Sequence, residues 1–224
     1  ERRYGWFPSI SGGWVPTQYD WYRNLLPFNN FLKFRASWGR VGNDRLKDEN
    51  GNDIRFPYLT TLGNVSSTWG TGLAENRTGS MNLKWEVSTK TNFGIDARFF
   101  DDKVDMTVDF FHTKTTDIFQ RRANIPDEGG LSNVLPYANI GSMKSWGMDG
   151  TLAYTHTFNK DMALTVRGNF THAENEVIYW EQSGVNYPYQ SNSGVPYKVQ
   201  RGLIALGLFK DEDDIKSSPK QTFM

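Results

Sequence analysis

Strict alternation of apolar and polar side chains is the feature that most constrains the fold of this chain. Residues 91–100 alternate between two parities: Phe93, Ile95, Ala97 and Phe99 on one, Asn92, Gly94, Asp96 and Arg98 on the other. Residues 103–111 alternate in the same way, and Asp101-Asp102 between them suits a two-residue turn. A period of two is typical of a strand with two different faces. These residues therefore predict a β-hairpin.

A second hairpin of the same kind is predicted further along the chain. Residues 150–158 and 162–171 both alternate, and residues 159–161 (Asn-Lys-Asp) make the turn. We expect strands of about 10–18 residues, longer than the 5–6 usual in globular sheets. Two earlier strands are expected near residues 7–15 and 31–39, with a short helix or irregular link at residues 19–26.

The connections between these strands differ in length. Residues 41–84 and 121–140 predict long loops rich in Gly, Pro, Asn and Ser, and a third long segment opens near Glu174. Short turns at one end of a sheet and long loops at the other are typical of outer-membrane barrels. The predicted fold is therefore all-β, an antiparallel transmembrane β-barrel segment: a partial barrel with long strands, short periplasmic turns and long extracellular loops.

The composition is compatible with such a barrel. Aromatic residues make up 15% of the 224 residues and Gly is frequent, yet the mean hydropathy is polar, at −0.61. Barrel strands need only alternate apolar residues, so a polar average does not exclude membrane insertion. The absence of Cys excludes disulfides, thiolate metal sites and cysteine nucleophiles. A net charge of zero gives no reason to expect nucleic acid as a partner.

Large aromatic residues are expected near the strand ends. Trp85 and Trp146 fall at the predicted long-loop ends, and Phe99, Phe100 and Phe158 fall beside the short turns. Aromatic girdles lie at these positions in membrane barrels. The alternative interpretation is that large aromatics are simply good strand formers.

The alternation also predicts which side chains meet lipid. We expect the following to point outward into hydrocarbon: Phe93, Ile95, Val104, Met106, Val108, Leu152, Leu164 and Val166. Those expected to point into the wet interior are Asp96, Arg98, Asp105, Asp109, Arg167 and Asn169. The reason is that Arg or Lys at mid-bilayer on the outside of a barrel costs about 2–4 kcal/mol.

No residue pattern indicates catalysis or a cofactor. His112, His156 and His172 are far apart and lack carboxylates at ligand spacing, so we predict no metal site. The acidic run from Asp211 to Asp214 lacks the Gly and the spaced Glu of an EF-hand, which leaves calcium binding as the minor alternative to a solvated loop. Phosphate-binding loops and nucleophile elbows are also missing from the sequence. The sequence therefore predicts a protein that is not an enzyme.

The predicted long loops carry exposed aromatic candidates for binding. They are Tyr58, Trp69, Trp180, Tyr187, Tyr189 and Tyr197. Such side chains either contact cargo or a partner protein, or pack among themselves within the loops.

Several segments resemble the SusC/RagA family of TonB-dependent outer-membrane transporters. In chain order they are residues 5–9 (GWFPS), 32–43 (LKFRASWGRVGN), 83–86 (LKWE), 92–96 (NFGID), 139–143 (NIGSM), 147–149 (GMD), 169–177 (NFTHAENEV) and 207–209 (GLF). Each motif is short, but the motifs follow one another in an order that resembles the second half of that family's barrel. The resemblance covers nearly the whole chain.

The resemblance implies a location and a function. It implies uptake of glycans or peptides across the outer membrane of a Gram-negative bacterium, with a SusD-like surface lipoprotein as lid and energy from the TonB complex. It further implies that residues 1–224 are part of one barrel domain, with the plug domain, the TonB-contact segment and the barrel-closing C-terminal strands outside this sequence. The alternative function is that of a soluble all-β carbohydrate-binding module.

Overall fold

One antiparallel sheet of six strands dominates the structure, a computed structural model that describes residues 4–47, 51–68, 70–125, 134–202, 204–205 and 207–218. The strand order is β1-β2-β5-β6-β7-β8. The strands are β1 (Ser9–Trp14), β2 (Asn29–Asn43), β5 (Glu86–Phe99), β6 (Val104–Arg121), β7 (Tyr137–Asn159) and β8 (Met162–Tyr179). The predicted all-β, antiparallel fold is confirmed.

The remaining elements are short. They are the hairpin of β3 (Thr61–Ser67) and β4 (Gly70–Arg77), the 3-10 helices η1 (Pro16–Gln18) and η3 (Pro188–Gln190), and the helices α1 (Asp20–Leu25) and α2 (Glu212–Ser217). α1 lies within the segment where a short helix was predicted. None of the helices in the described ranges is long and apolar enough to cross a membrane.

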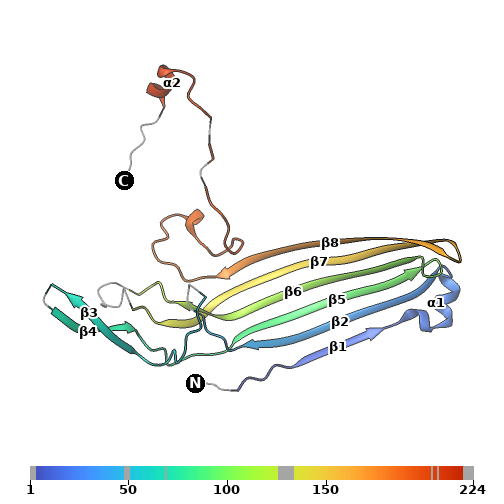
Figure 1. Cartoon of the computed structure of the whole chain (residues 1–224), viewed down its shortest axis with the longest axis horizontal. Helices are drawn as coiled ribbons and strands as arrows, with labels where there is room; N and C mark the ends of the chain where they lie inside the picture. Colours follow the sequence, from blue (N-terminus) through green and yellow to red (C-terminus); the bar gives the residue numbers. More distant parts are fainter. Residues whose placement is uncertain are drawn as a thin grey trace.

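The tight turns gather at one end of the sheet, together with η1 and α1, and the long connections leave from the other end (Figure 1). The β5–β6 turn is longer than the two residues predicted, because the strands end at Phe99 and resume at Val104. Phe100, Asp101 and Asp102 all have positive φ, between 55° and 60°. At the β7–β8 turn, the backbone N–H of Asp161 donates to Asn159 Oδ1 at 3.0 Å, which is the local bonding expected of Asn in a turn.

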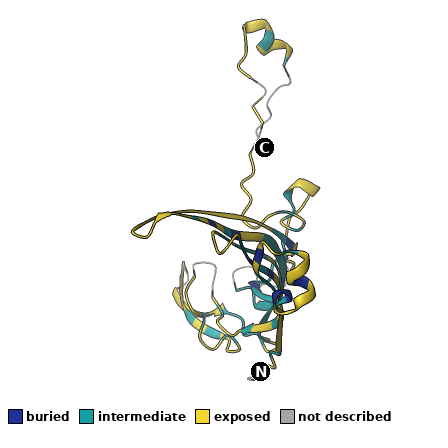
Figure 2. Ribbon diagram, turned by 90° about the vertical axis from the view of Figure 1, so that its right-hand side faces the viewer, coloured by how far each residue is buried: buried dark blue, intermediate teal, exposed yellow. Residues whose placement is uncertain are grey.

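The main sheet forms a single curved layer (Figure 2). Few apolar side chains are buried in the described part of the chain: Pro16, Tyr22, Ala97, Ala153 and Val177. β1 and β8 form the two edges of this sheet and do not pair with each other, so the barrel is open. A soluble sandwich would cover one face with a second sheet, and the only other sheet among the described residues is the small β3–β4 hairpin.

The long-loop end departs from the sequence prediction in three places, one of which is that β8 continues to Tyr179, past Glu174, where a loop was expected to open. The predicted loop of residues 41–84 contains the β3–β4 hairpin. β7 begins at Tyr137, well before Trp146, so the prediction that Trp146 lies at a strand end is wrong. Asp117 has φ 56° within a β-bulge of β6, and this bulge lets β6 and β7 continue pairing into the segment that was predicted as loop.

Candidate functional site

The strand register divides the sheet into one apolar and one polar face. On the first, Ile95 pairs with Val108, Met106 with Leu152 and Tyr154 with Val166. The eight residues predicted to face lipid all fall on this apolar face, and the six predicted to face the interior all fall on the other. The predicted division of side chains between two faces is therefore confirmed.

The apolar face is open to solvent in this chain. Phe93 is 43% exposed, Leu152 50% and Val166 60%. Contiguous exposed side chains of this kind indicate a surface that another apolar phase or protein covers.

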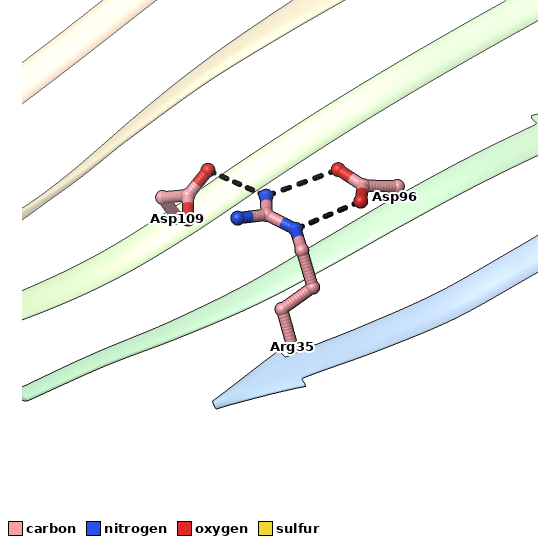
Figure 3. Close-up of polar contacts among 3 residues, drawn as sticks. All are labelled: Arg35, Asp96 and Asp109. Carbon is pink, nitrogen blue, oxygen red and sulfur yellow. Dashed lines mark hydrogen bonds and ion pairs between the residues drawn. The ribbon is translucent and has the colours of Figure 1, made fainter. Parts of the chain in front are cut away.

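Arg35 on β2 is the centre of a charged network on the polar face (Figure 3). Its Nε and Nη2 donate to the two carboxylate oxygens of Asp96 on β5, at 2.8 and 3.0 Å, and Nη2 also donates to Asp109 on β6, at 2.9 Å. A Cβ at Gly94 would lie 2.6 Å from Arg35 Nη2, so a larger residue there would displace the guanidinium from this position. The network ties three neighbouring strands together through two-point binding of a carboxylate, the strongest geometry for an Arg ion pair.

An ion pair with a buried carboxylate connects two long loops. Arg122, just after β6, donates to Glu181, just after β8, at 2.7 Å, and the Glu181 side chain is only 3% exposed. The backbone N–H of Asn124 also donates to Glu181, at 2.9 Å. The pair fixes the start of the β6–β7 loop against the segment that leaves β8.

Trp180 and Tyr197 meet beside this ion pair. Their ring centroids are 6.0 Å apart, and both residues line a cavity of about 430 Å³. The cavity is also lined by Lys47, Gln120 and Lys198. Gln120 is 5% exposed, and neither atom of its side-chain amide has a hydrogen-bond partner among the described residues. A buried amide beside aromatic and cationic side chains is suited to hold a polar ligand.

The other predicted loop aromatics lie elsewhere. Tyr187 and Tyr189, around η3, stack at 5.5 Å with their rings 8° from parallel, and both are exposed. Tyr58 packs edge-on against Phe56 at 6.2 Å. Trp69 lies outside the described residues. The structure therefore brings the candidates together in two pairs, one at the cavity and one on an exposed tip, and keeps Tyr58 apart from them.

The histidines and the acidic run have local partners. His172 lies 3.3 Å from Glu174, and His156 packs against Phe158 with ring centroids 4.5 Å apart. In the acidic run, Asp211 Oδ1 accepts the backbone N–H of Asp214 at 2.8 Å and so caps α2. Among the described residues no group of three His, Asp or Glu side chains is placed to hold a metal ion.

Comparison with known proteins shows to which family the chain with this two-faced sheet belongs. Residues 1–223 match the family described as TonB dependent receptor-like, beta-barrel. The chain belongs to this family. The predicted resemblance to SusC/RagA transporters is confirmed, because the named relatives and solved structures include SusC and RagAB.

Two curated relatives show how much of a TonB-dependent receptor this chain represents. It is 33% identical over 177 residues to TonB-dependent receptor P39 of Formosa agariphila, covering 79% of this chain and 16% of that protein. It is 26% identical over 182 residues to TonB-dependent receptor SusC of Bacteroides thetaiotaomicron, covering 79% and 17%. The chain therefore spans about one sixth of the length of these receptors.

A solved structure agrees with this assignment. The RagAB peptide importer in its open-open state superposes with a TM-score of 0.65 at 25% identity, over 79% of this chain and 18% of that one. This receptor family consists of transporters and receptors rather than enzymes, and its SusC and RagA members are outer-membrane β-barrel proteins of Gram-negative bacteria.

The sequence interpretation of this receptor segment missed several polar residues. Arg35, Arg122 and Glu181 were not predicted as partners, and Gln120 and Lys47 were not predicted beside Trp180. The bonded pairs are 61 and 59 residues apart in sequence. The only sequence signal was their chemistry: a guanidinium on the polar parity of one strand and carboxylates on the polar parity of the next.

Proposed function

We propose that this chain forms part of the wall and extracellular loops of an outer-membrane importer of glycans or peptides. The importer works with a SusD-like surface lipoprotein as lid and takes energy from the TonB complex through parts of the protein outside this sequence. Residues 1–224 contribute to a single barrel domain and perform no covalent chemistry. The observation that carries the proposal is the long-stranded sheet with one exposed apolar face and one charged face.

The apolar face has the height that a membrane requires. Trp146 and Phe158 bound its apolar part on β7. Phe158 is 12 residues beyond Trp146, which at about 3.3 Å per residue and a tilt of about 40° gives a rise of about 30 Å. The hydrocarbon core of a bilayer is about 30 Å thick. The two aromatic positions thus match the two membrane interfaces, and Trp146 belongs to the outer girdle although it lies inside a strand.

The two open edges support a larger barrel. Unpaired edge strands beneath an apolar face are unstable in lipid, because backbone N–H and C=O groups have no water there. Transporters of the TonB-dependent type close with about 22 strands. We therefore propose that the remaining strands of the same polypeptide complete the pairing at β1 and β8.

The loop residues are the proposed contacts for cargo or lid. Trp180 and Tyr197 at the cavity suit a sugar ring or a peptide side chain, because flat aromatic faces bury apolar area at little entropic cost. The stacked pair Tyr187 and Tyr189 is exposed on a tip, where a covering lid would meet it. Tyr58 and Trp69 are proposed contacts from the β2–β5 connection.

The alternative, a soluble carbohydrate-binding module, would use the same loop aromatics. It requires a second layer over the apolar face, and the described residues supply none. The family assignment also favours the importer.

The test uses the full-length parent protein in its own bacterium. We expect it to fractionate with outer membranes, to resist extraction by salt, and to support uptake of one oligosaccharide or peptide class only when the TonB complex is intact. A Trp180→Ala variant should reduce uptake at limiting cargo while leaving the amount of folded barrel unchanged. Recovery of the parent in the soluble fraction would favour the binding module, and uptake that persists without the TonB complex would refute the energy source.

A further inference from the structure

A row of cations crosses the apolar face immediately beyond the outer aromatic girdle. The strand register aligns Trp38 on β2 and Trp146 on β7 in one row. The next row towards the long loops consists of Arg40, Thr89, Lys114, Lys144 and Glu176. Arg40, Lys114 and Lys144 are here called the basic row. They have the same parity as the lipid-facing residues, so they point outward and not into the barrel.

Lys114 and Lys144 face each other directly across the β6–β7 pair. Like charges at directly opposite positions of an antiparallel pair destabilise the sheet. Lys144 is partly compensated, because its Nζ lies 3.0 Å from Glu176 and 5.3 Å from the ring centroid of Trp146. Lys114 is exposed, and neither it nor the Arg40 side chain has an ion-pair partner among the described residues.

The surroundings leave an excess of positive charge. A hollow of about 350 Å³ beside the row is lined by Arg40, Lys84 and Asp117, together with Trp6 and Trp85. Arg40, Lys84, Lys114 and Lys144 carry four positive charges in and beside the row, against the carboxylates of Asp117 and Glu176 and, one row away, Glu174, which leaves an excess of one positive charge. One row nearer the short turns, Glu174 contacts His172 rather than a lysine.

We propose that the basic row binds the phosphate of an anionic lipid headgroup in the outer leaflet. The inference rests on the proposed membrane function, because that function places the long-loop end outside the cell and the basic row at headgroup height. Lys and Arg stems cover apolar surface while their charged ends reach the interface. A phosphate between Lys114 and Lys144 would turn their mutual repulsion into two charge-assisted hydrogen bonds, and Thr89 offers a hydroxyl in the same row.

The test compares variants of the full-length protein in detergent, with purified lipid A as the probe. Binding is followed by the rise in the temperature at which the folded band disappears in a heat-modifiable gel. We expect Lys114→Gln to weaken lipid A binding about tenfold, the effect of losing one charge-assisted contact. The double variant Lys114→Gln, Lys144→Gln should lose most of the remaining binding. Without lipid, Lys114→Gln should unfold at the same temperature as the wild type or slightly higher, because it removes a repulsion.

The controls separate a lipid site from general charge effects. Lys160→Gln removes a cation at the opposite end of the sheet, and Lys33→Gln removes one from the polar face; both should leave the lipid response intact. Lipid A without its phosphate groups should give little response. If inorganic phosphate alone reproduces the full response, the row is a free-anion site and the lipid proposal is overturned. Equal lipid A responses in the double variant and the wild type would also overturn it.

These outcomes are separable from failure of the proposed function. A parent that fractionates with outer membranes and imports cargo, but whose lipid response is unchanged in the double variant, refutes only the lipid site. A parent that is soluble refutes the importer and the lipid site together.

Discussion

The two ends of this sheet are built on different principles. Towards the short turns, β5, β6 and β7 pair without a register shift, as in the row of Phe93, Phe110 and Met148, and the shifts at this end lie in the first residues of β2 and the last residues of β7. Towards the long loops, the β6–β7 pairing shifts on both sides of Ile118, and the β3–β4 hairpin interrupts the connection between β2 and β5. The regular end is a wall, and the irregular end is where the cavity and the loop aromatics lie.

The difference shows which interactions specify the regular end of the sheet and which hold the long-loop end together. The wall is specified by alternation, because one face must be apolar over the height of a membrane. The loop end is held by single polar contacts between distant segments, such as Arg122 with Glu181 and the Lys84 N–H with Asn139 Oδ1. Substitutions in the wall should therefore affect assembly, and substitutions at the loop end should affect recognition.

The largest effect is expected from a charge in the middle of the apolar face. Val108 lies between Ile95 and Gly150 on that face. Val108→Arg in the full-length protein would place a guanidinium in hydrocarbon at a cost of about 2–4 kcal/mol. We expect a marked loss of folded barrel, measured by heat-modifiable gel mobility. Val166→Arg should behave in the same way.

The matched control is the neighbouring residue on the polar face. Asp109→Asn should be milder, because the amide oxygen still accepts from Arg35. If Val108→Arg folds as well as the wild type while Asp109→Asn does not, the assignment of the two faces is inverted. The apolar face would then be a soluble core and the carbohydrate-binding module the better function.

Much of the wall could be predicted, because the residues that specify its strands and turns are neighbours in the sequence. Residues 91–111 and 150–171 alternate strictly, and Asn159 and the Asp101-Asp102 pair indicate the turns. The length of the β5–β6 turn was missed, because positive φ at Phe100 is not expected of a bulky residue. The extension of β7 back to Tyr137 was also missed, because Pro136 and the Gly-rich segment before it indicated a loop.

Little of the loop end could be predicted, because its contacts join residues far apart in the chain. Trp180 and Tyr197 were candidates on chemistry alone, and their meeting at a cavity depends on the path of the chain after β8. Gln120 follows the bulge at Asp117, and alternation along β6 alone does not reveal that bulge. The sequence indicated binding candidates by their residue type, but it did not indicate which of these residues come together in space.

The second largest effect is expected at the polar-face network. Arg35→Met would leave Asp96 and Asp109 without their shared cation, and we expect a loss of about 2 kcal/mol of stability. The measurement is urea unfolding of the full-length protein in detergent. Arg98→Met is the control, since its pair with Asp102 is 3.5 Å long and exposed and its guanidinium lies 4.7 Å over the Phe31 ring; these two contacts together should contribute about 1 kcal/mol or less. Equal losses in the two variants would show that the two-point geometry at Arg35 adds nothing.

A smaller and local effect is expected at the loop ion pair. Glu181→Gln puts an amide N–H₂ where an oxygen now accepts from Arg122 or Asn124, and should weaken the loop contact by about 1 kcal/mol. We expect faster hydrogen exchange in residues 180–198, with the strands of the wall unchanged. Glu174→Gln, at the exposed contact with His172, is the control and should leave that exchange unchanged. Faster exchange throughout β6 and β7 would contradict the separation of loop end from wall.

The smallest effect is expected at the tight turn of the wall. Asp101 has φ 55°, a left-handed conformation that costs a residue with a Cβ about 1–2 kcal/mol, less for Asp than for most residues. Asp101→Gly removes that cost but adds about 0.5–1 kcal/mol of chain entropy to the unfolded state. Its backbone N–H still donates to Asn30 Oδ1, so only the long 3.4 Å contact from Asn30 Nδ2 is lost. We therefore expect a gain of stability of about 0.5 kcal/mol or less in urea unfolding, whereas Asp101→Val should destabilise, since a β-branched side chain fits this conformation poorly. If Asp101→Gly instead costs as much as Arg35→Met, the Asp101 side chain contributes to the wall through more than its backbone conformation.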